Sequence, residues 1–577
     1  MPGQDFRFYK AINLNFQWKN ITFTWKVKAI MNKKVLENKI IYQIFPRSFY
    51  DANDDGDGDL QGIIKKIPYL ANLGINAIWL CPIYSTKFVD AGYDVLDYKN
   101  VWKQFGTLAD FKKLQKVAQK NGIDIIMDIV INHVSSDHVW FKKALESKNN
   151  KEHEYFIWRD NLSEEEKKAE SLFGGSAWEY VPHLNRYYFH LFSKEQVDLN
   201  WNNPKMIDAM VDVVDFWYKL GVKGFRIDAI KHIAKDFKTL ESNPAFAWCS
   251  GAVKFLKEFN KKAFVDKPDA YTFGEASSIT ADEVLKYASG KQKVADNYYN
   301  FAWWWIGWGK LGRNEYNPNW EIKAFADSQK PFQENLKIKP YMITNFLSNH
   351  DTSRSISRWG DTDFFFEESA KSHAMLLFML KGIPCIYYGE EIGLLNTKFS
   401  DISEFRDCDS FNFYDKYVKQ DKVFSDKEFL RNSNINSRDA GRSLMQWDNS
   451  INAGFNLGFE TWFNLGSNQE KINAKDQIKD KNSIFNFYKK LIDLRKNELN
   501  SILIHGTSEI NCDSKTNLIT IKRVYKTKEL TVLINMTNRE IKLNKLPQGS
   551  VILSTYNLEN VVIDSKLRPY ESIAILK

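Results

Sequence analysis

The chain has 577 residues, of which 44% are hydrophobic and 15% aromatic, so it can bury a large core and is too long for one ordinary domain. Its 80 Lys and Arg residues exceed its 72 Asp and Glu residues, but the net charge of +8 is dispersed, without an Arg-rich block or a nucleic-acid motif. No run of about 18 apolar residues occurs. We therefore expect neither a nucleic-acid partner nor a membrane-spanning segment.

Residues 1–38 are predicted to form an N-terminal extension. The first 30 lack the basic and then apolar pattern of a secretory signal, and Met31 precedes the first candidate strand closely, so we expect residues 1–30 to be dispensable. The cysteines are odd in number, scattered and without CxxC spacing, which indicates free thiols in a reducing compartment; they are Cys81, Cys249, Cys385, Cys408 and Cys512. The sequence thus predicts a cytoplasmic location, and we expect a monomer.

An acidic run, DANDDGDGD at 51–59, follows the first candidate strand. Oxygen-bearing side chains at alternate positions, with Gly56 at the bend, are typical of a calcium-binding loop. The rest of an EF-hand is missing, because position twelve of the loop is Gly62 rather than Glu. The spacing predicts a structural Ca²⁺ here, with a solvated acidic turn as the alternative. The candidate ligands are Asp51, Asn53, Asp55, Asp57 and Asp59.

Candidate strands alternate with amphipathic segments such as 110–122 and 206–221. This alternation predicts an α/β fold, a parallel (β/α)8 TIM barrel built from residues 39–133 and 206–499. The strands are predicted to end near Phe45, Leu80, Asp128, Asp228, Glu275, Phe301, Leu347 and Tyr388.

Two further domains are predicted around the barrel. Residues 134–205 are too many for a simple connection, so we expect them to form an inserted B domain after strand three. After a last helix near 482–498 the chain turns to short alternating runs, which predict a C-terminal antiparallel β domain at 500–577.

Acidic residues stand at or just after the ends of three candidate strands, where a barrel gathers its active-site residues. Cleavage of a glycosidic bond with retention needs a carboxylate nucleophile and a protonated carboxylic acid about 5–5.5 Å apart. Asp228 is the candidate nucleophile, Glu275 the acid/base, and Asp351 a carboxylate that grips sugar hydroxyls and stabilises the transition state. Arg226 points the same way as Asp228 along the strand and would keep it ionised. Any one of the three carboxylates alone would more often be a helix cap or a solvated loop residue.

The segments around these residues resemble the α-amylase superfamily, glycoside hydrolase family 13, over about residues 39 to 500. They are DIVINH at 128–133, GFRIDAIKH at 224–232, TFGEAS at 272–277 and FLSNHD at 346–351. QVDLN at 196–200 and SRDAGRSLMQW at 437–447 look most like the oligo-1,6-glucosidase and α-glucosidase branch. The resemblance implies an exo-acting retaining α-glucosidase that acts on short oligosaccharides without an organic cofactor, and a Ca²⁺ or Mg²⁺ site at the loop after strand one.

The resemblance also implies a subsite for the terminal glucose. Its residues would be Tyr93 as an aromatic platform, His133 and His350 as hydroxyl-binding histidines, and Phe192 and Gln196 as pocket lining. Arg442 would pair with Asp90 and close the pocket behind this glucose. The aromatic run WWWIGWG at 303–309, on the loop after strand six, is either a sugar-stacking surface or a pocket wall.

The residue after the nucleophile departs from the branch, because Ala229 stands where oligo-1,6-glucosidases typically have Val. A small residue here would widen the first aglycone subsite, so we expect maltose-type α-1,4 substrates to be hydrolysed at least as fast as isomaltose. The alternatives are a transglycosylase, a sucrose-, trehalose- or trehalose-phosphate-acting enzyme and an α-amylase-like member of the superfamily. A non-catalytic scaffold on the same fold is a more remote alternative.

Overall fold

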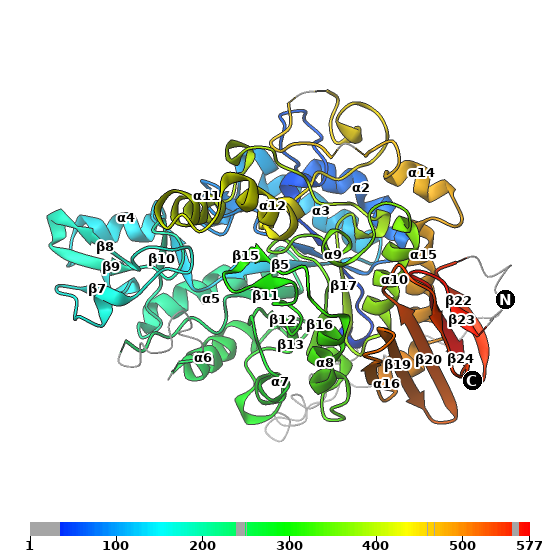
Figure 1. Ribbon diagram of the computed structural model, residues 1–577. Coiled ribbons are helices and arrows are strands. Elements are labelled where there is room, and N and C mark those ends of the chain that lie inside the picture. The colour runs from blue at the N-terminus through cyan, green and yellow to red at the C-terminus, as the bar shows by residue number, and fades with distance from the viewer. Residues whose placement is uncertain (1–34, 238–247, 250, 459, 467, 557–564) are drawn as a thin grey trace, which may run out of the picture.

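The computed structural model describes residues 35–577 except 238–247, 250, 459, 467 and 557–564 (Figure 1). The segment 1–30, expected to be dispensable, lies outside the described residues. No helix of the described part is long and apolar enough to cross a bilayer.

Eight parallel strands close into a barrel, in agreement with the predicted fold. Neighbouring strands pair in register around the ring, and β1 closes it against β17 with Ile41 opposite Cys385. Each strand ends within two residues of its predicted end. The strands are β1 (Ile41–Ile44), β2 (Ala77–Leu80), β5 (Asp124–Val130), β11 (Gly224–Asp228), β12 (Tyr271–Gly274), β13 (Asn297–Tyr299), β16 (Ile343–Asn345) and β17 (Ile383–Tyr387).

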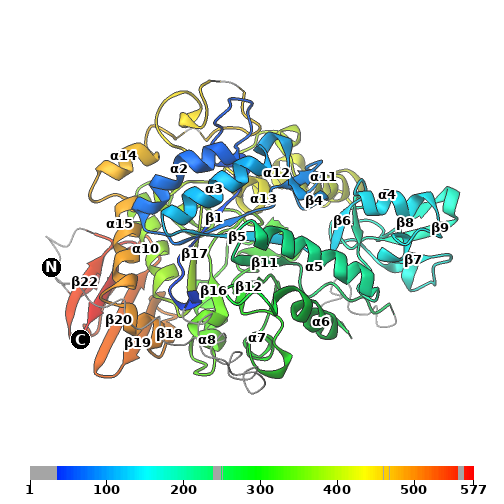
Figure 2. The ribbon, with the colours of Figure 1, turned by 180° about the vertical axis from the view of Figure 1, so that it is seen from behind.

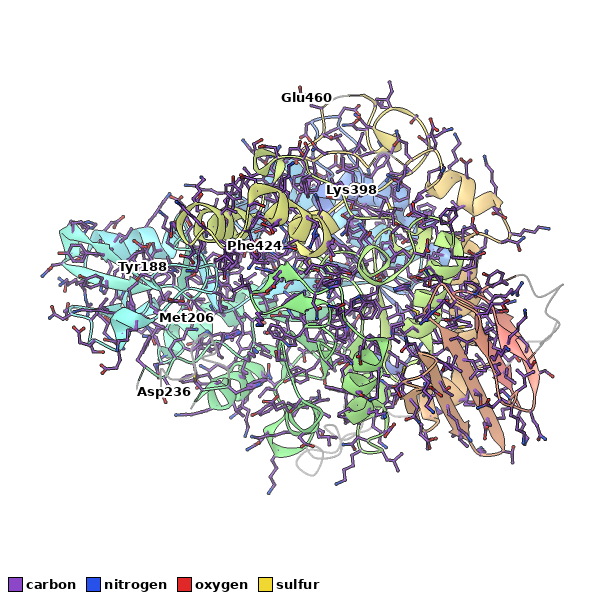
Figure 3. All side chains as sticks on the ribbon, viewed as in Figure 1. Tyr188, Met206, Asp236, Lys398, Phe424 and Glu460 are labelled. Carbon is purple, nitrogen blue, oxygen red and sulfur yellow. The ribbon has the colours of Figure 1, made fainter. Side chains whose placement is uncertain are left out.

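Helices surround the barrel and cover the outer face of its strands (Figures 1 and 2). Helix α3 shows the amphipathic pattern that this position favours: it turns Phe111, Leu114 and Ala118 inward, and a capping box between Thr107 and Asp110 starts it. Side chains fill the space between strands and helices, and Met206 of α5, labelled in Figure 3, is fully buried. The helices are α2 (Leu60–Leu73), α3 (Leu108–Lys120), α5 (Pro204–Lys219), α6 (Ala252–Phe264), α7 (Ala281–Ala288), α8 (Ile322–Gln333), α10 (Phe366–Met379) and α15 (Ile484–Lys496).

The segment between β5 and α5 forms a lobe at one end of the molecule, drawn in cyan in Figure 1. A three-stranded antiparallel sheet, β7 (Trp158–Arg159), β9 (Arg186–Phe189) and β8 (Trp178–Val181), packs around its own small core with α4 (Val139–Glu146) nearby. A second ladder joins β6 (His133–Ser135) to β10 (Gln196–Asp198). This ladder brings two predicted site residues, His133 and Gln196, to the edge of the barrel.

The short helix α9 (Ser355–Trp359) lies between β16 and α10. After β17 the chain continues through α11 (Cys408–Tyr414), α12 (Asp426–Asn436), α13 (Arg438–Gly441) and α14 (Ala474–Lys479). Beyond α15 and α16 (Asn500–His505) a five-stranded antiparallel sheet closes the chain. It packs on α10, where Ser372 donates to the carbonyl oxygen of Tyr570 at 2.7 Å. The sheet contains β18 (Glu509–Cys512), β19 (Leu518–Tyr525), β20 (Lys528–Asn535), β24 (Ser572–Leu576) and β22 (Ser550–Ser554).

Candidate active site

The three predicted catalytic carboxylates line one cavity of about 360 Å³ at the carboxyl ends of the barrel strands. Asp228 ends β11, Glu275 follows β12, and Asp351 follows β16. Four predicted substrate-binding residues line the same cavity, namely Asp90, Tyr93, His133 and Phe192. The other four, Gln196, Arg226, His350 and Arg442, lie behind them and contact them.

Arg226 binds the candidate nucleophile as the strand alternation predicts. Its Nη1 lies 2.6 Å from Oδ1 of Asp228 and 2.7 Å from Oδ1 of Asp128, and its Nη2 lies 3.9 Å from Oε2 of Glu275. The guanidinium is buried, and the surrounding carboxylates hold its pKa well above the usual range although desolvation works against the charge. One guanidinium therefore lies beside three carboxyl groups on adjacent strands, so the cluster has fewer cations than acidic groups.

Burial raises the pKa of Asp228, Arg226 opposes the increase, and the Glu275 and Asp128 carboxylates add to it. Asp228 and Asp128 share the Arg226 cation, so their protonation is linked and a proton that they retain belongs to the pair rather than to one residue. Acid/nucleophile chemistry requires in addition that one carboxyl group is protonated while its neighbour is ionised.

Glu275 is positioned by the strand beside its own. Its Oε2 accepts the backbone N–H of Ala229 at 2.8 Å, and its carbonyl oxygen accepts the N–H of Ile230 at 3.1 Å. Ala229 has a left-handed conformation with φ of 45°. This sharp turn after β11 directs the peptide N–H at the neighbouring carboxylate.

Asp351 lies among cations and hydrogen-bond donors. Its Oδ1 is 3.3 Å from Nη1 of Arg438 and 3.7 Å from Nη2 of Arg442, and its Oδ2 is 3.1 Å from Nε2 of His350. Its pKa is lowered to about 2: burial works against the charge, and His350 and the two arginines outweigh it. Because burial also lowers the pKa of His350 to about 3, that imidazole is neutral near pH 7, and we assign the ionisation of Asp351 to the arginines.

Tyr93 and His350 form a stacked pair beside the carboxylates. The ring centroids are 5.3 Å apart at an interplanar angle of 12°, and the tyrosine hydroxyl lies 2.7 Å from Nε2 of His350. The same hydroxyl donates to Oδ2 of Asp128 at 3.0 Å. Both side chains are thereby fixed in a polar network that continues to Arg226.

The predicted pairing of Asp90 with Arg442 is wrong. Arg438, one helical turn earlier, takes that place, with its Nη2 3.1 Å from Oδ1 of Asp90. The guanidinium of Arg442 instead turns to Asp407, at 2.9 Å, and to the carbonyl oxygen of His350, at 2.8 Å. The reason is Asp407, a carboxylate from the loop before α11 that binds both arginines.

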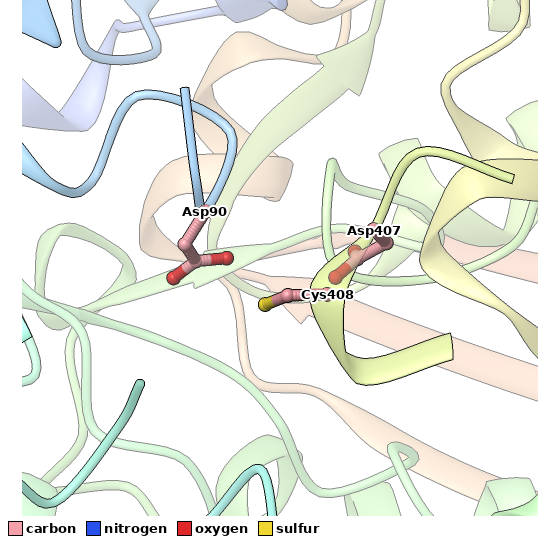
Figure 4. A group of neighbouring side chains, drawn as sticks. All are labelled: Asp90, Asp407 and Cys408. Carbon is pink, nitrogen blue, oxygen red and sulfur yellow. The ribbon is translucent and has the colours of Figure 1, made fainter. Parts of the chain in front are cut away.

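Figure 4 shows Asp90, Asp407 and Cys408 close together. Among the described residues they are the one group of three acidic, His or Cys side chains whose ligand atoms lie within 4.8 Å of one another. Arg438 binds both carboxylates, and burial raises the pKa of the Cys408 thiol, so this is an ion-pair network with a neutral thiol rather than a cation site. Asp90 and Arg438 of this network line the cavity.

The inserted lobe supplies the remaining wall. Gln196 donates to Oδ2 of Asp90 at 3.0 Å, and its Nε2 lies 3.0 Å from Nε2 of His133. Phe192 meets the His133 ring edge to face, with centroids 5.0 Å apart. Burial lowers the pKa of His133 to about 4, so this imidazole is neutral near pH 7 and can exchange hydrogen bonds with hydroxyls.

The acidic loop uses its side chains unequally. Asp51 accepts four N–H groups, from Asn53, Asp54, Gly56 and the Asn456 side chain, which fills its lone pairs. Asp57 pairs with Arg47. In the hydrogen bonds of the described residues, lone pairs stay unused on the other four predicted ligands, namely Asn53, Asp55, Asp57 and Asp59, and Arg47 occupies one oxygen of Asp57. These all-oxygen donors fit a hard cation.

Three residues that shape the site had no predicted role. Arg438 lies in the 437–447 motif, where the pattern alone did not distinguish it from Arg442. Asp128 begins the 128–133 motif, so its position was a usable signal. Asp407 lies in an irregular segment, and no local pattern indicates its place between Arg438 and Arg442.

Comparisons with known proteins agree with this geometry. The model of the α-amylase catalytic domain matches residues 43–506. The oligo-1,6-glucosidase of Parageobacillus thermoglucosidasius is 35% identical over 553 residues, which cover 92% of this chain and 97% of that protein.

Two similar solved structures carry other activities. One is a variant of Bacillus licheniformis trehalose-6-phosphate hydrolase, with a TM-score of 0.87, 32% identity and coverage of 94% of this chain and 99% of that one. The other is the isomaltulose synthase of Protaminobacter rubrum, with a TM-score of 0.85, 32% identity and the same coverage of both chains. With this barrel, these carboxylates and a match over most of its length, the chain belongs to the α-amylase family of glycoside hydrolases.

Proposed function

We propose that the protein is a retaining, exo-acting α-glucosidase that releases glucose from the non-reducing end of short α-glucosides. The observation that carries the proposal is that the three carboxylates and the ion pair of Asp90 with Arg438 line one cavity. Asp407 lies behind that lining and binds both Arg438 and Arg442. In this proposal the ion-pair network blocks the cavity behind the terminal sugar, so a chain enters with its non-reducing end first.

The chemistry follows from the positions of Asp228 and Glu275. A carboxylate oxygen of Asp228 attacks the anomeric carbon, while the bond to the leaving oxygen breaks and Glu275 gives that oxygen its proton. Glu275 then takes a proton from water, whose oxygen attacks the anomeric carbon and releases the Asp228 carboxylate. Because Oε2 of Glu275 accepts the Ala229 N–H, the transferred proton sits on Oε1.

The other residues hold the terminal glucose in this proposal. Asp351, ionised through Arg438 and Arg442, accepts hydrogen bonds from two ring hydroxyls and stabilises the positive charge of the transition state. His133, which is neutral and lines the cavity, binds a further hydroxyl, and Tyr93 supports the ring face, with His350 stacked behind it rather than in contact with the sugar.

A structural Ca²⁺ or Mg²⁺ at the 51–59 loop is part of the proposal. Asn53, Asp55 and Asp59 would bind it with the lone pairs that their hydrogen bonds leave free, and Asp51 would orient the loop. We further propose a monomer that acts in the cytoplasm, which the five free cysteines support.

A substrate panel tests the function. Purified enzyme should release glucose with retained configuration from maltose or isomaltose and their longer homologues, as followed by NMR of the anomeric proton. The names of the relatives include oligo-1,6-glucosidase, glucan 1,6-alpha-glucosidase and trehalose-6-phosphate hydrolase. Exclusive hydrolysis of trehalose 6-phosphate, or sucrose isomerisation without glucose release, would refute the proposal in favour of those alternatives.

A further inference from the structure

The aromatic run after strand six reaches the cavity. Trp304, Trp305 and Trp308 line it, whereas Trp303 of the same run is buried in the core. Trp305 is 56% exposed and is the most exposed tryptophan among the described residues. An indole left in water at the mouth of a sugar-binding cavity costs solvation free energy that a ligand can recover by covering the ring.

These indoles are held rigidly. Trp308 meets Trp304 and Trp305 edge to face, with centroids 5.7 Å and 5.0 Å apart. Their loop continues into a hairpin, β14 (Trp308–Gly309) and β15 (Gly312–Tyr316), and Arg358 donates to the carbonyl oxygen of Ile306 at 2.5 Å. Rings fixed in this way need little ordering when a ligand stacks on them.

A second aromatic group borders the same cavity from α11 and the turn that follows it. Phe413 lines the cavity and stacks on Tyr417, with centroids 5.7 Å apart and an interplanar angle of 7°. The segment is tied to the inserted lobe, because Asn412 donates to the carbonyl oxygen of Phe173 at 3.0 Å. Phe173 also lines the cavity, so the lobe, α11 and the sixth loop all contribute rings to its wall.

The charges of this wall are already paired. Of the two arginines that line the cavity, Arg313 pairs with Asp409, and Arg438 pairs with Asp90, Asp407 and Asp351. No lysine of the described chain lines the cavity. A phosphoryl group carried by the leaving sugar would find apolar rings and neutralised arginines here, whereas an uncharged sugar offers its C–H faces to the rings.

We propose that Trp304, Trp305, Trp308 and Phe413 form a binding surface for the second and later units of a neutral oligosaccharide. The three carboxylates and these rings line the same cavity, so a chain whose terminal unit lies at the carboxylates meets the rings with its next units. This inference rests on the proposed α-glucosidase function. It names the substrate class as uncharged glucose oligomers longer than two units rather than disaccharides or sugar phosphates.

The test compares kcat/KM along two series, isomaltose to isomaltopentaose and maltose to maltopentaose, with trehalose 6-phosphate as a third substrate. We expect kcat/KM to rise at least about tenfold from the two-unit to the four-unit sugar in the preferred series. Trp305→Ala should reduce that ratio at least about fivefold. Phe364→Ala is the matched control, because Phe364 is 94% exposed and does not line the cavity.

The outcomes separate the two proposals. If disaccharides are hydrolysed and kcat/KM does not rise with chain length, the assignment of this binding surface is overturned and the α-glucosidase proposal stands. Inactivity on every neutral α-glucoside refutes the proposed function itself. A higher kcat/KM on trehalose 6-phosphate than on any neutral oligomer overturns the substrate class. An unchanged chain-length ratio in Trp305→Ala, with the variant folded by circular dichroism, also overturns the assignment.

Discussion

The backbone N–H of Ala229 donates to Oε2 of Glu275 at 2.8 Å, so the peptide that follows the candidate nucleophile also positions the candidate acid. The left-handed turn at Ala229 makes this possible, because it directs the N–H across to the neighbouring strand end. The two groups of a double displacement are thereby coupled through one backbone segment. Substitutions at 229 should consequently affect both steps of the reaction.

Replacement of either catalytic carboxyl group should abolish turnover without unfolding the chain. Asp228→Asn removes the nucleophile, and Glu275→Gln removes general acid catalysis, which alone is usually worth about 10²–10⁴ in rate. We expect kcat on a disaccharide to fall by several orders of magnitude at a nearly unchanged melting temperature. An aryl glucoside with an activated leaving group should form the glycosyl-enzyme in Glu275→Gln, seen as a burst. Retention of more than about a tenth of the wild-type kcat in either variant would disprove the assignment.

Ala229 should influence linkage preference. Its left-handed conformation disfavours a β-branched residue, and its side chain borders the cavity beside Asp228. We expect wild-type kcat/KM on maltose to equal or exceed that on isomaltose, and Ala229→Val to lower both this ratio and the melting temperature. Ala229→Gly, which tolerates the conformation, is the control for strain. If the wild type prefers isomaltose by more than about tenfold, equal to about 1.4 kcal/mol, residue 229 does not set the linkage.

The alternation of short apolar runs with amphipathic segments was enough to predict the barrel, because its strands are buried on both faces and its helices on one. The strand ends then located the carboxylates, and alternation located Arg226. The sequence could not predict which arginine pairs with Asp90, because Arg438 and Arg442 lie one helical turn apart. Asp407, distant in the sequence, binds Arg442, and Arg438 pairs with Asp90.

The acidic loop shows the same limit. Alternate spacing predicts five equivalent ligands, but Arg47 engages Asp57. Asp59, another of the five, caps α2 through the N–H of Gly62. The spacing of acidic residues identifies the loop, whereas tertiary contacts determine which of its side chains cap a helix, form an ion pair or remain available to a cation.

Loss of Arg438 should damage stability and substrate binding together. Its removal would leave Asp90 and Asp407 as buried carboxylates without their shared cation, and breaking a buried pair in this way costs about 3–5 kcal/mol. We expect Arg438→Met to unfold at lower denaturant concentration and to raise KM strongly. The double variant Asp90→Asn with Arg438→Met should recover part of the stability. Strictly additive losses in that cycle would show that the two side chains do not interact.

Stability should fall in mild acid because of buried neutral histidines. Burial lowers the pKa of His138, His133 and His373 to about 4 and that of His350 to about 3. The unfolded chain, with histidine pKa values near 6.5, binds more protons than the native state below that pH. The free energy of unfolding is therefore not reduced by these histidines above about pH 6.5, and it decreases as the pH falls from there toward 4. Asp351, with its pKa lowered to about 2, extends the loss below about pH 3.8.

The variant His373→Met tests this linkage away from the active site. His373 is buried in α10, and its Nδ1 lies 2.8 Å from the carbonyl oxygen of Ser369. Denaturant titrations between pH 4 and 7 should show that the free energy of unfolding depends less steeply on pH in the variant. The difference in slope should correspond to the uptake of up to about one proton fewer on unfolding. An identical slope in the two proteins would mean that His373 is not neutral in the native state.

Removal of divalent cations should lower the melting temperature, because a ligand that binds only the native state stabilises it by mass action. The effect should reach the segment around residue 455: Asp51 donates its N–H to the carbonyl oxygen of Phe455, Asn456 donates to Asp51, and Leu457 donates to Asp54. We expect EDTA to lower the melting temperature, Ca²⁺ or Mg²⁺ to restore it, and hydrogen exchange to rise in both segments. Asp55→Asn should remove the response to the ion, whereas Asp57→Asn, whose carboxylate pairs with Arg47, should retain it. Melting curves that coincide with and without chelator, in a protein shown by mass spectrometry to have lost its metal, would leave the loop as a solvated acidic turn.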